Sequence, residues 1–215
     1  MAVKVLKGRN VKVEVATVYG TAKAVTAITK ASPAVVSSAA HGLTSGAVGY
    51  FDAMNGMQEI DGMAATVANT TTGTFELPDV DSTNYTSFNS GNFIPVQTWA
   101  TLVNATKVDI GGGDASKIDV TTLLDNGKQE ENGMLAAQSV SIDVLIEQTT
   151  NAAATFLKAR ARDGGFALVR LTYPNGSRRI FRGQPSLPGE SVGVDAVVSG
   201  SLGMTVKGYV ISTDI

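Results

Sequence analysis

The stretch SVGVDAVVSGSLGMTVKGYV, residues 191–210, gives the clearest indication of the fold. From Val192 to Val210 the even positions are apolar or glycine, and the odd positions are mostly polar. Alternation with a period of two is typical of a β-strand that buries one face. The pattern covers residues 192–210, whereas strands usually have about 5–6 residues. It therefore predicts one very long strand, or two strands joined by a bulge or turn at Gly200.

Segments upstream of this stretch predict an antiparallel sheet. The same alternation runs from Gln138 to Ile146, with valine and isoleucine on one face and serine and aspartate on the other. Residues 166–173 and 177–182 predict two strands joined by the turn Pro174-Asn175-Gly176. Asparagine and glycine tolerate the left-handed backbone conformations that short hairpin turns require.

One α-helix is expected between these strands, at about 150–163. Its apolar positions form an i, i+3, i+4 stripe, which is typical of a helix that packs on a sheet: Ala153, Phe156, Leu157 and Ala161. Thr149, Thr150 or Asn151 can cap its N-terminus. Gly164 can end it.

The composition excludes several classes of enzyme. The 215 residues include no cysteine and one histidine. Disulfides, thiolate zinc sites and cysteine nucleophiles are therefore impossible, and one histidine leaves little for a zinc enzyme or a Ser-His-Asp triad. The net charge of −2 argues against a general nucleic-acid binder. We expect neither catalytic residues nor a metal or cofactor.

Neither a targeting segment nor a membrane span is expected. Lysine and arginine interrupt the N-terminal stretch MAVKVLKGRNVKVEV, which therefore lacks the apolar region of a signal peptide. Nowhere does an apolar run reach the length of about 18 residues that a membrane span requires.

Charge divides the chain into two parts. Residues 24–93 carry one basic and six acidic side chains, a net charge of −5, which leaves +3 on the remainder. With its short Thr/Ser/Gly-rich strands, this step predicts a small all-β domain at 24–93, inserted into a core domain of residues 1–23 and 94–215. The strands expected in the insert are Val35-Val36, Ala47–Phe51, Ala64–Val67 and Thr74–Leu77. The flanking strands Val11–Thr17 and Val96–Ile110 are expected to be neighbours in the core domain.

Residues 111–134 are expected to form a long functional loop. They lack a sustained periodicity and carry seven charges of mixed sign. Long segments without secondary structure are uncommon in compact domains unless they have a function. The apolar residues of this loop need a surface to bury against, which we expect on another subunit. The expected subunit-interface residues are Ile118, Val120, Leu123, Leu124, Lys128, Glu130 and Glu131.

Other conspicuous residues have structural interpretations. His41 could be a ligand or a base, but it stands alone in a Gly/Ser-rich stretch and is expected to serve a turn or packing. The run Gly111–Lys117 lacks the complete motif of a phosphate-binding loop, so flexibility is the better interpretation. Trp99 is expected in the core or an interface, although exposed aromatic side chains can bind sugars.

Two sets of charged residues could also have more than one role. The acidic residues of the insert could bind calcium, but they lack EF-hand spacing, and a solvated acidic face is the simpler interpretation: Asp52, Glu59, Asp61, Asp79 and Asp81. Arg178, Arg179 and Arg182 could contact DNA phosphates, but an intersubunit or surface role is expected instead.

The C-terminal half resembles the tail tube proteins of lambda-like bacteriophages with long non-contractile tails (siphophages). The resemblance rests on the helix 152–162, the turn Tyr173–Gly176, the step Phe181-Arg182-Gly183 and the final long strand. The segment IDVTTLLDNGKQEENGM, residues 118–134, resembles the extended loop that those proteins place between subunits.

The insert is similar to a small β module of phage virion proteins that itself resembles a half-domain of ubiquitin-activating enzymes. The similarity is carried by Ala40–Leu43, Gly56-Met57, Asp61-Gly62, Thr74–Leu77 and Asp81–Thr83. It implies a fold and no reaction, because the chain has no cysteine for activating-enzyme chemistry.

These resemblances imply a mainly β fold: an antiparallel β-sandwich or barrel of the phage tail tube type, with one helix, an interface loop at 111–134 and the inserted domain. They imply hexameric rings that stack into the virion's tail tube and are assembled in the host bacterial cytoplasm. Implied partners are further copies, other tail proteins (tape measure, terminator, baseplate or tip) and phage DNA passing through the lumen without sequence-specific binding. A head-to-tail contact that does not close produces such a filament.

Two other functions stay open. The chain could be a cell-surface or carbohydrate-binding β protein with the insert as its binding module. A hydrolase is a weaker alternative, because the sequence offers no credible acid–base pair.

Overall fold

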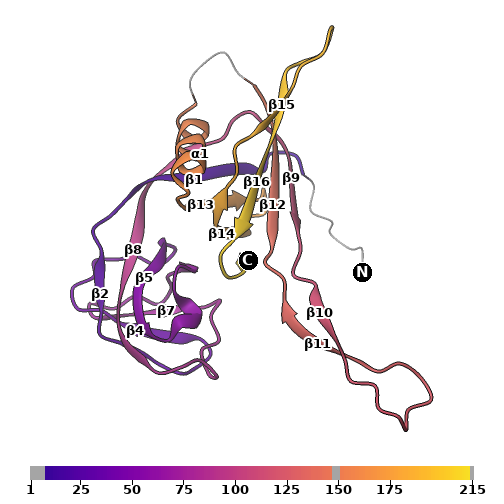
Figure 1. The fold of residues 1–215 in the computed structure, drawn as a ribbon. Helices are drawn as coiled ribbons and strands as arrows, with labels where there is room; N and C mark the ends of the chain where they lie inside the picture. The colour runs from indigo at the N-terminus through magenta and orange to yellow at the C-terminus, as the bar shows by residue number, and fades with distance from the viewer. Residues whose placement is uncertain (1–7, 147–150, 214–215) are drawn as a thin grey trace, which may run out of the picture.

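The structure is built mainly from antiparallel strands (Figure 1). A computed structural model describes residues 8–146 and 151–213. Within them lie the strands named below, a 3₁₀ turn η1 (Gln58–Ile60) and one α-helix, α1 (Ala152–Asp163). No helix of this part of the chain is long and apolar enough to cross a membrane. The predicted mainly β fold with one α-helix is confirmed.

Most strands belong to one large sheet. Its main path runs, in spatial order, through β6 (Ala64–Thr66), β5 (Val48–Gly56), β8 (Phe88–Thr101), β1 (Lys12–Tyr19), β13 (Ala167–Thr172), β14 (Arg178–Pro185), β16 (Ser199–Val206), β12 (Ser139–Leu145) and β9 (Ala105–Gly111). Beside this path, β2 (Lys23–Val25) pairs with β8, β15 (Gly189–Ser191) with β16, and β17 (Ile211–Thr213) with β14. Two small sheets comprise β3 (Ala27–Ile28), β4 (Ala34–Ser37) and β7 (Thr74–Leu77), and β10 (Ala115–Asp119) with β11 (Glu130–Leu135).

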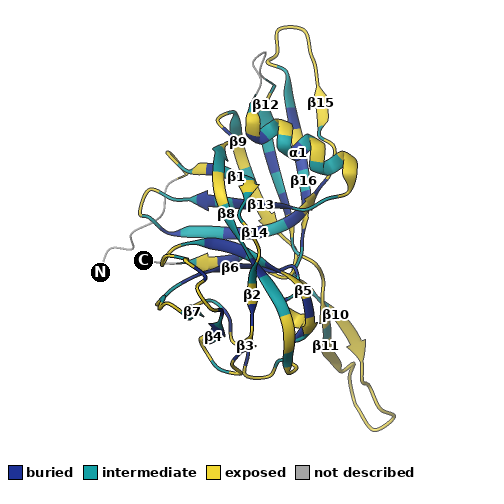
Figure 2. Cartoon of the chain, turned by 90° about the vertical axis from the view of Figure 1, so that its left-hand side faces the viewer, coloured by how far each residue is buried: buried dark blue, intermediate teal, exposed yellow. Residues whose placement is uncertain are grey.

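Two parts of the large sheet enclose a hydrophobic core. The strands β9, β12 and β16 cross β1 and β13, and α1 lies beside them (Figure 2). Val15 of β1, Ile142 of β12, Leu157 of α1 and Phe181 of β14 are all buried in this core. This arrangement is consistent with the predicted β-sandwich.

A second hydrophobic core lies within residues 25–93. Phe93 is fully buried there, with its ring centroid 5.2 Å from those of Phe51 and Phe75. The strands β4, β5, β6 and β7 occur where the sequence predicted strands in the insert. The strand β8 is continuous across residues 93 and 94, where the predicted domain boundary lies. The division into a core domain (1–23 plus 94–215) and an inserted domain (24–93) therefore stays a prediction.

The helix and the following hairpin form as their local signals predict. The Asn151 side chain accepts hydrogen bonds from the backbone N–H groups of Ala153 and Ala154, and Gly164 ends α1 in the left-handed conformation. Thr149 and Thr150, the other proposed caps, lie outside the described residues. The turn after Tyr173 is closed by a 2.9 Å hydrogen bond from its N–H to the Ser177 carbonyl.

The predicted continuous strand from Val192 to Val210 is wrong. The alternation holds in β16, where Leu202, Met204 and Val206 are buried, but the chain turns between β15 and β16. Asp195 has a φ of 60° in this turn, and Val194 is 96% exposed. Gly200 lies inside β16 rather than at a turn, and a Cβ there would lie 2.8 Å from the Gly189 carbonyl oxygen of β15. Glycine at this position therefore lets β15 approach β16.

Two further predictions need correction. Residues 96–110 form two strands, since the chain turns at residues 102–104 between β8 and β9. The part in β8 does pair with β1, as expected, whereas β9 pairs with β12. Residues 111–134 are not a loop throughout, because most of their length belongs to β10, β11 and the connection between them. Their pairing is local, and the sequence carries no clear alternation that would reveal it.

Candidate assembly surfaces

The strands β10 and β11 form a hairpin that projects from one end of the molecule (Figures 1 and 2). The hairpin continues the pair β9–β12 beyond the sandwich, because β9 leads into β10 and β11 leads into β12. Gly112 and Gly113 connect β9 to β10 with φ values of 85° and 88°, a conformation that glycine adopts at little cost. The glycine run is therefore the connection between β9 and β10.

All seven expected interface residues lie on this β10–β11 hairpin, and the structure leaves all of them exposed. At its tip, Leu123 and Leu124 are 105% and 93% exposed. Met134 and Leu135, which the sequence analysis did not single out, are exposed as well. Full burial of such a side chain contributes roughly 1.5–3 kcal/mol. The interface role of the seven residues stays a prediction.

Short polar contacts order the tip of the hairpin. Asp125 accepts hydrogen bonds from the backbone N–H and the hydroxyl of Thr122, and these bonds hold its pKa below the usual value. Asp119 accepts hydrogen bonds from the hydroxyl and N–H of Thr121, which likewise lower its pKa. Lys128 is 2.5 Å from Glu130 in an exposed ion pair. These contacts keep the tip acidic and hold its two leucines in a defined turn.

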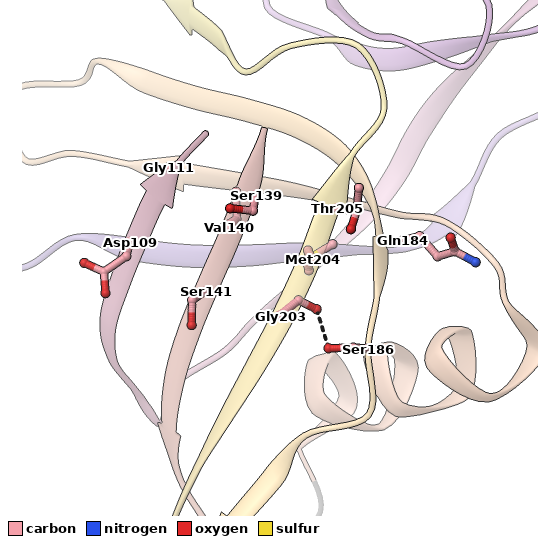
Figure 3. A pocket seen from close by; sticks show the side chains of 10 residues that line it. All are labelled: Asp109, Gly111, Ser139, Val140, Ser141, Gln184, Ser186, Gly203, Met204 and Thr205. Atoms are coloured by element: carbon pink, nitrogen blue, oxygen red, sulfur yellow. Dashed lines mark hydrogen bonds between the residues drawn. The ribbon is translucent and has the colours of Figure 1, made fainter. Parts of the chain in front are cut away.

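A second candidate surface is the polar face of β9, β12 and β16, opposite the face that contributes to the core. Ser139, Ser141 and Asp143 of β12 alternate with the buried residues of that strand. Their neighbours across the sheet include Asp109 of β9 and Ser201 of β16. A groove of about 350 Å³ lies on this face. Gln184, Ser186 and Thr205 are among the residues that border it (Figure 3). The face consists mostly of small hydroxyl and carboxylate side chains.

Charge on this polar face is partly balanced. Lys107 lies 2.6 Å from Asp109 in an ion pair that raises the pKa of the lysine, first through the hydrogen bond and then through the opposite charge. The serine hydroxyls of Ser141 and Ser201 are 3.0 Å apart. The arrangement suits a hydrated surface and offers no nucleophile paired with a base.

The connection between β15 and β16 is a third exposed surface, at the end of the molecule opposite the β10–β11 hairpin (Figure 1). The sequence pattern does not predict this surface, because the alternation places Val192 and Val194 on the buried face of a long strand. Both are exposed, as are Leu187 and Val197. Gly193 and Asp195 were the available turn signals.

His41 and Trp99 have the structural roles expected for them. His41 is buried, its Nδ1 accepts a hydrogen bond from the Leu43 N–H, and its ring packs edge-on against Phe75. Trp99 lies inside β8, partly buried, with the Arg170 guanidinium 4.2 Å from its ring centroid. It is therefore covered on one face rather than offered as a sugar platform.

The acidic residues of the insert form ion pairs or hydrogen bonds with different neighbouring residues. Asp61 is 3.3 Å from Lys207, Glu59 accepts hydrogen bonds from Thr86, and Asp81 accepts them from Thr83. Within the described residues, no group of three or more His, Cys, Asp and Glu side chains could hold a metal ion.

The three candidate arginines, Arg178, Arg179 and Arg182, lie on β14. Arg182 donates a hydrogen bond of 3.0 Å to the Gly62 carbonyl of the same molecule, and the intersubunit or surface role expected for it stays a prediction. Arg178 and Arg179 are half-buried at the start of β14.

A β-sandwich with projecting, apolar-tipped hairpins is typical of a protein that assembles with copies of itself, since unpaired strand edges and exposed apolar residues favour association. A sequence model of the family described as "Phage tail tube protein, TTP" matches residues 55–213. The chain therefore belongs to the phage tail tube protein family, whose members are structural components of phage tails. The expected family is confirmed, whereas the similarity of the insert to an activating-enzyme half-domain stays a prediction.

Comparison with solved structures finds a chain of a structure described as "Tail of empty GTA particle computed with helical refinement, C6 symmetry". The sequences are 15% identical, the match covers 55% of this chain and 88% of that chain, and the TM-score is 0.45. No curated protein matches the sequence.

Proposed function

We propose that this chain is a structural subunit that polymerises as stacked rings, six copies to a ring, to form the tail tube through which phage DNA is delivered. Membership of the tail tube family supports this proposal. The observation that carries it is the exposed β10–β11 hairpin with Leu123 and Leu124 at its tip. Side chains of this kind gain burial only by contact with another molecule.

The shape of the subunit favours head-to-tail growth. The β10–β11 hairpin leaves one end of the molecule, and the β15–β16 connection leaves the other (Figure 1). Contacts between two different surfaces repeat without limit when the rotation does not close. Rings that stack through the hairpin would grow in this way into a tube.

We further propose that the polar face of β9, β12 and β16 lines the channel. Its serine and threonine side chains are accompanied by Asp109 and Asp143, and its cation Lys107 is paired with Asp109. Phosphates are held mainly by unpaired basic side chains, so DNA could slide past such a face without being retained. In this arrangement the acidic 24–93 unit lies on the outside of the tube.

We also propose the partners of the subunit and the compartment in which it assembles. The tube would be assembled in the host bacterial cytoplasm and would contact the tape measure, terminator and baseplate or tip proteins of the tail. Its work is assembly without catalysis. No specific observation favours a carbohydrate-binding or hydrolytic function, since Trp99 is covered by Arg170.

A deletion tests the proposal. The full chain should form tubes of regular diameter in electron micrographs, whereas a variant lacking residues 112–132 should stay a folded monomer. Residues in this segment belong neither to the two hydrophobic cores described above nor to a smaller third one that includes Ala16, Leu168 and Ile180. Circular dichroism and thermal unfolding should therefore change little. Regular tubes formed by the deletion variant would show that the hairpin is not needed for assembly.

A further inference from the structure

An aromatic pocket lies where α1, β1 and β5 meet the chain before β13. It encloses about 350 Å³ and is lined by Tyr19, Tyr50, Phe156, Phe166, Arg160 and Arg182. Aromatic and arginine side chains are the residues most enriched at the energetic centres of protein interfaces. This pocket is separate from the β10–β11 hairpin and from the polar face of β9, β12 and β16.

The walls of the pocket are held firmly. The Arg182 guanidinium lies between two rings, 4.2 Å from the centroid of Tyr50 and 4.5 Å from that of Phe166. Tyr19 packs edge-on against Tyr50 with ring centroids 5.4 Å apart. Burial raises the pKa of both tyrosines, so both stay neutral at physiological pH. Such a pre-formed pocket loses little conformational freedom on binding.

Arg160 presents a partly exposed guanidinium to the pocket. Its Nη1 is 3.2 Å from an Asp163 carboxylate oxygen, and its guanidinium lies 5.2 Å from the Phe156 ring centroid. Its Nε is buried and finds no hydrogen-bond partner among the described residues. None of the described residues that line the pocket is acidic. The pocket therefore fits an occupant with both apolar and anionic groups.

We propose that this pocket receives the tip of the β10–β11 hairpin, Thr121–Asp125, from a second copy of the chain. The inference rests on the proposed function and names the surface that the hairpin contacts. Leu123 and Leu124 supply apolar groups to the aromatic walls, and Asp125 supplies a carboxylate to Arg160. Residues 111–134 carry two basic and five acidic side chains, so the segment has a net charge of −3 opposite two arginines.

The placement of the two surfaces agrees with head-to-tail contact. The pocket includes side chains of α1, and α1 lies toward the end of the molecule remote from the hairpin tip (Figures 1 and 2). The β15–β16 connection also lies at that end, but Asp195 of the connection and Glu190 of β15 are acidic, and no side chain between residues 187 and 198 is basic. Like charges across an interface oppose association, which favours the pocket over this connection.

Charge reversal tests the proposal. Arg160→Glu should reduce polymerisation by about tenfold or more, because close charge pairs across an interface are strongly coupled. Mixing it with Asp125→Arg protein should restore part of the loss, because each contact between an altered pocket and an altered tip regains opposite charges. Arg162→Glu, on an exposed position of the same helix, is the matched control and should polymerise normally. Normal polymerisation by Arg160→Glu would overturn the proposal.

Cross-linking separates this proposal from the proposed function. The chain has no cysteine, so Leu124→Cys protein mixed with Thr17→Cys protein can be joined at one chosen pair. Thr17 also lines the pocket, and oxidation of the polymer should yield a covalent dimer. Tubes that instead join Leu124→Cys to Val194→Cys, with no product at Thr17→Cys, would overturn the docking alone. Absence of any polymer from the unaltered chain would overturn the proposed function, and the docking with it.

Discussion

The core within residues 25–93 and the β10–β11 hairpin are both antiparallel β-structure, but they bury their apolar residues differently. In the first, phenylalanine side chains from β5, β7 and β8 pack together without exposure. In the second, every residue from 114 to 135 is exposed or half-buried. Backbone pairing therefore does not distinguish a stabilising element from an assembling one. Burial by side chains of the same molecule does.

Truncating a buried ring should have the largest effect on stability. Phe75→Ala removes a fully buried side chain beside Phe93, and such changes cost about 3–5 kcal/mol. Urea unfolding of the monomer measures the loss. Leu124→Ala is the matched control at the exposed tip and should change the free energy of unfolding by less than about 0.5 kcal/mol. Equal losses of unfolding free energy in the two variants would show that the core within residues 25–93 and the hairpin tip do not differ in their contribution to stability.

A partly buried ion pair should have the next largest effect. The Arg170 guanidinium is 2.8 Å from Glu14, both side chains are 17% exposed, and the arginine also stacks on Trp99. Glu14→Gln leaves the arginine without its counter-charge, so the free energy of unfolding should fall by about 2 kcal/mol. The exposed pair of Lys107 and Asp109 provides the control, since Lys107→Gln should cost under about 0.5 kcal/mol. A comparable loss from both variants would contradict the role of burial.

Polar substitutions at the hairpin tip should separate folding from assembly. Leu123→Ser combined with Leu124→Ser should leave the free energy of unfolding within about 0.5 kcal/mol of the unaltered chain. The same variant should remain monomeric by sedimentation velocity under conditions in which the unaltered chain forms tubes. Thr106→Ser, an exposed position of β9, is a control expected to polymerise. Tubes formed by the double variant would assign the contact to other residues.

The smallest effect concerns the pH dependence of the tip. Hydrogen bonds from Thr122 lower the pKa of Asp125, so their stabilising contribution is present above the unfolded value of about 3.9 and is lost as the pH falls through the lower folded value. NMR titration of Asp125 in the monomer should therefore give a midpoint below that value. Thr122→Val should raise the midpoint by removing the hydroxyl donor. An unchanged midpoint would show that this turn is not formed in solution.

Much of the fold could be predicted because its signals are local. Asn151 and Gly164 mark the ends of α1, and Asn175-Gly176 marks a hairpin, because each depends on the backbone conformation of a few neighbouring residues. The apolar tip of the β10–β11 hairpin could also be recognised locally, because its two consecutive leucines lie among charged residues. The aromatic pocket could not be predicted. Tyr19, Tyr50 and Phe156 are far apart in sequence and meet only through the sheet and the helix that packs on it.

Local sequence patterns are enough to predict strands with one apolar face, a capped helix and an exposed acidic segment with apolar residues. Which apolar positions become buried depends instead on how distant segments pack together. Leu202 and Val194 have the same place in the alternation, yet Leu202 is buried and Val194 is exposed. A period of two specifies the two faces of a strand, but burial requires a second surface, which distant segments provide for β16 and not for the connection before it. Apolar residues left without such a surface are therefore the ones available for contact between copies.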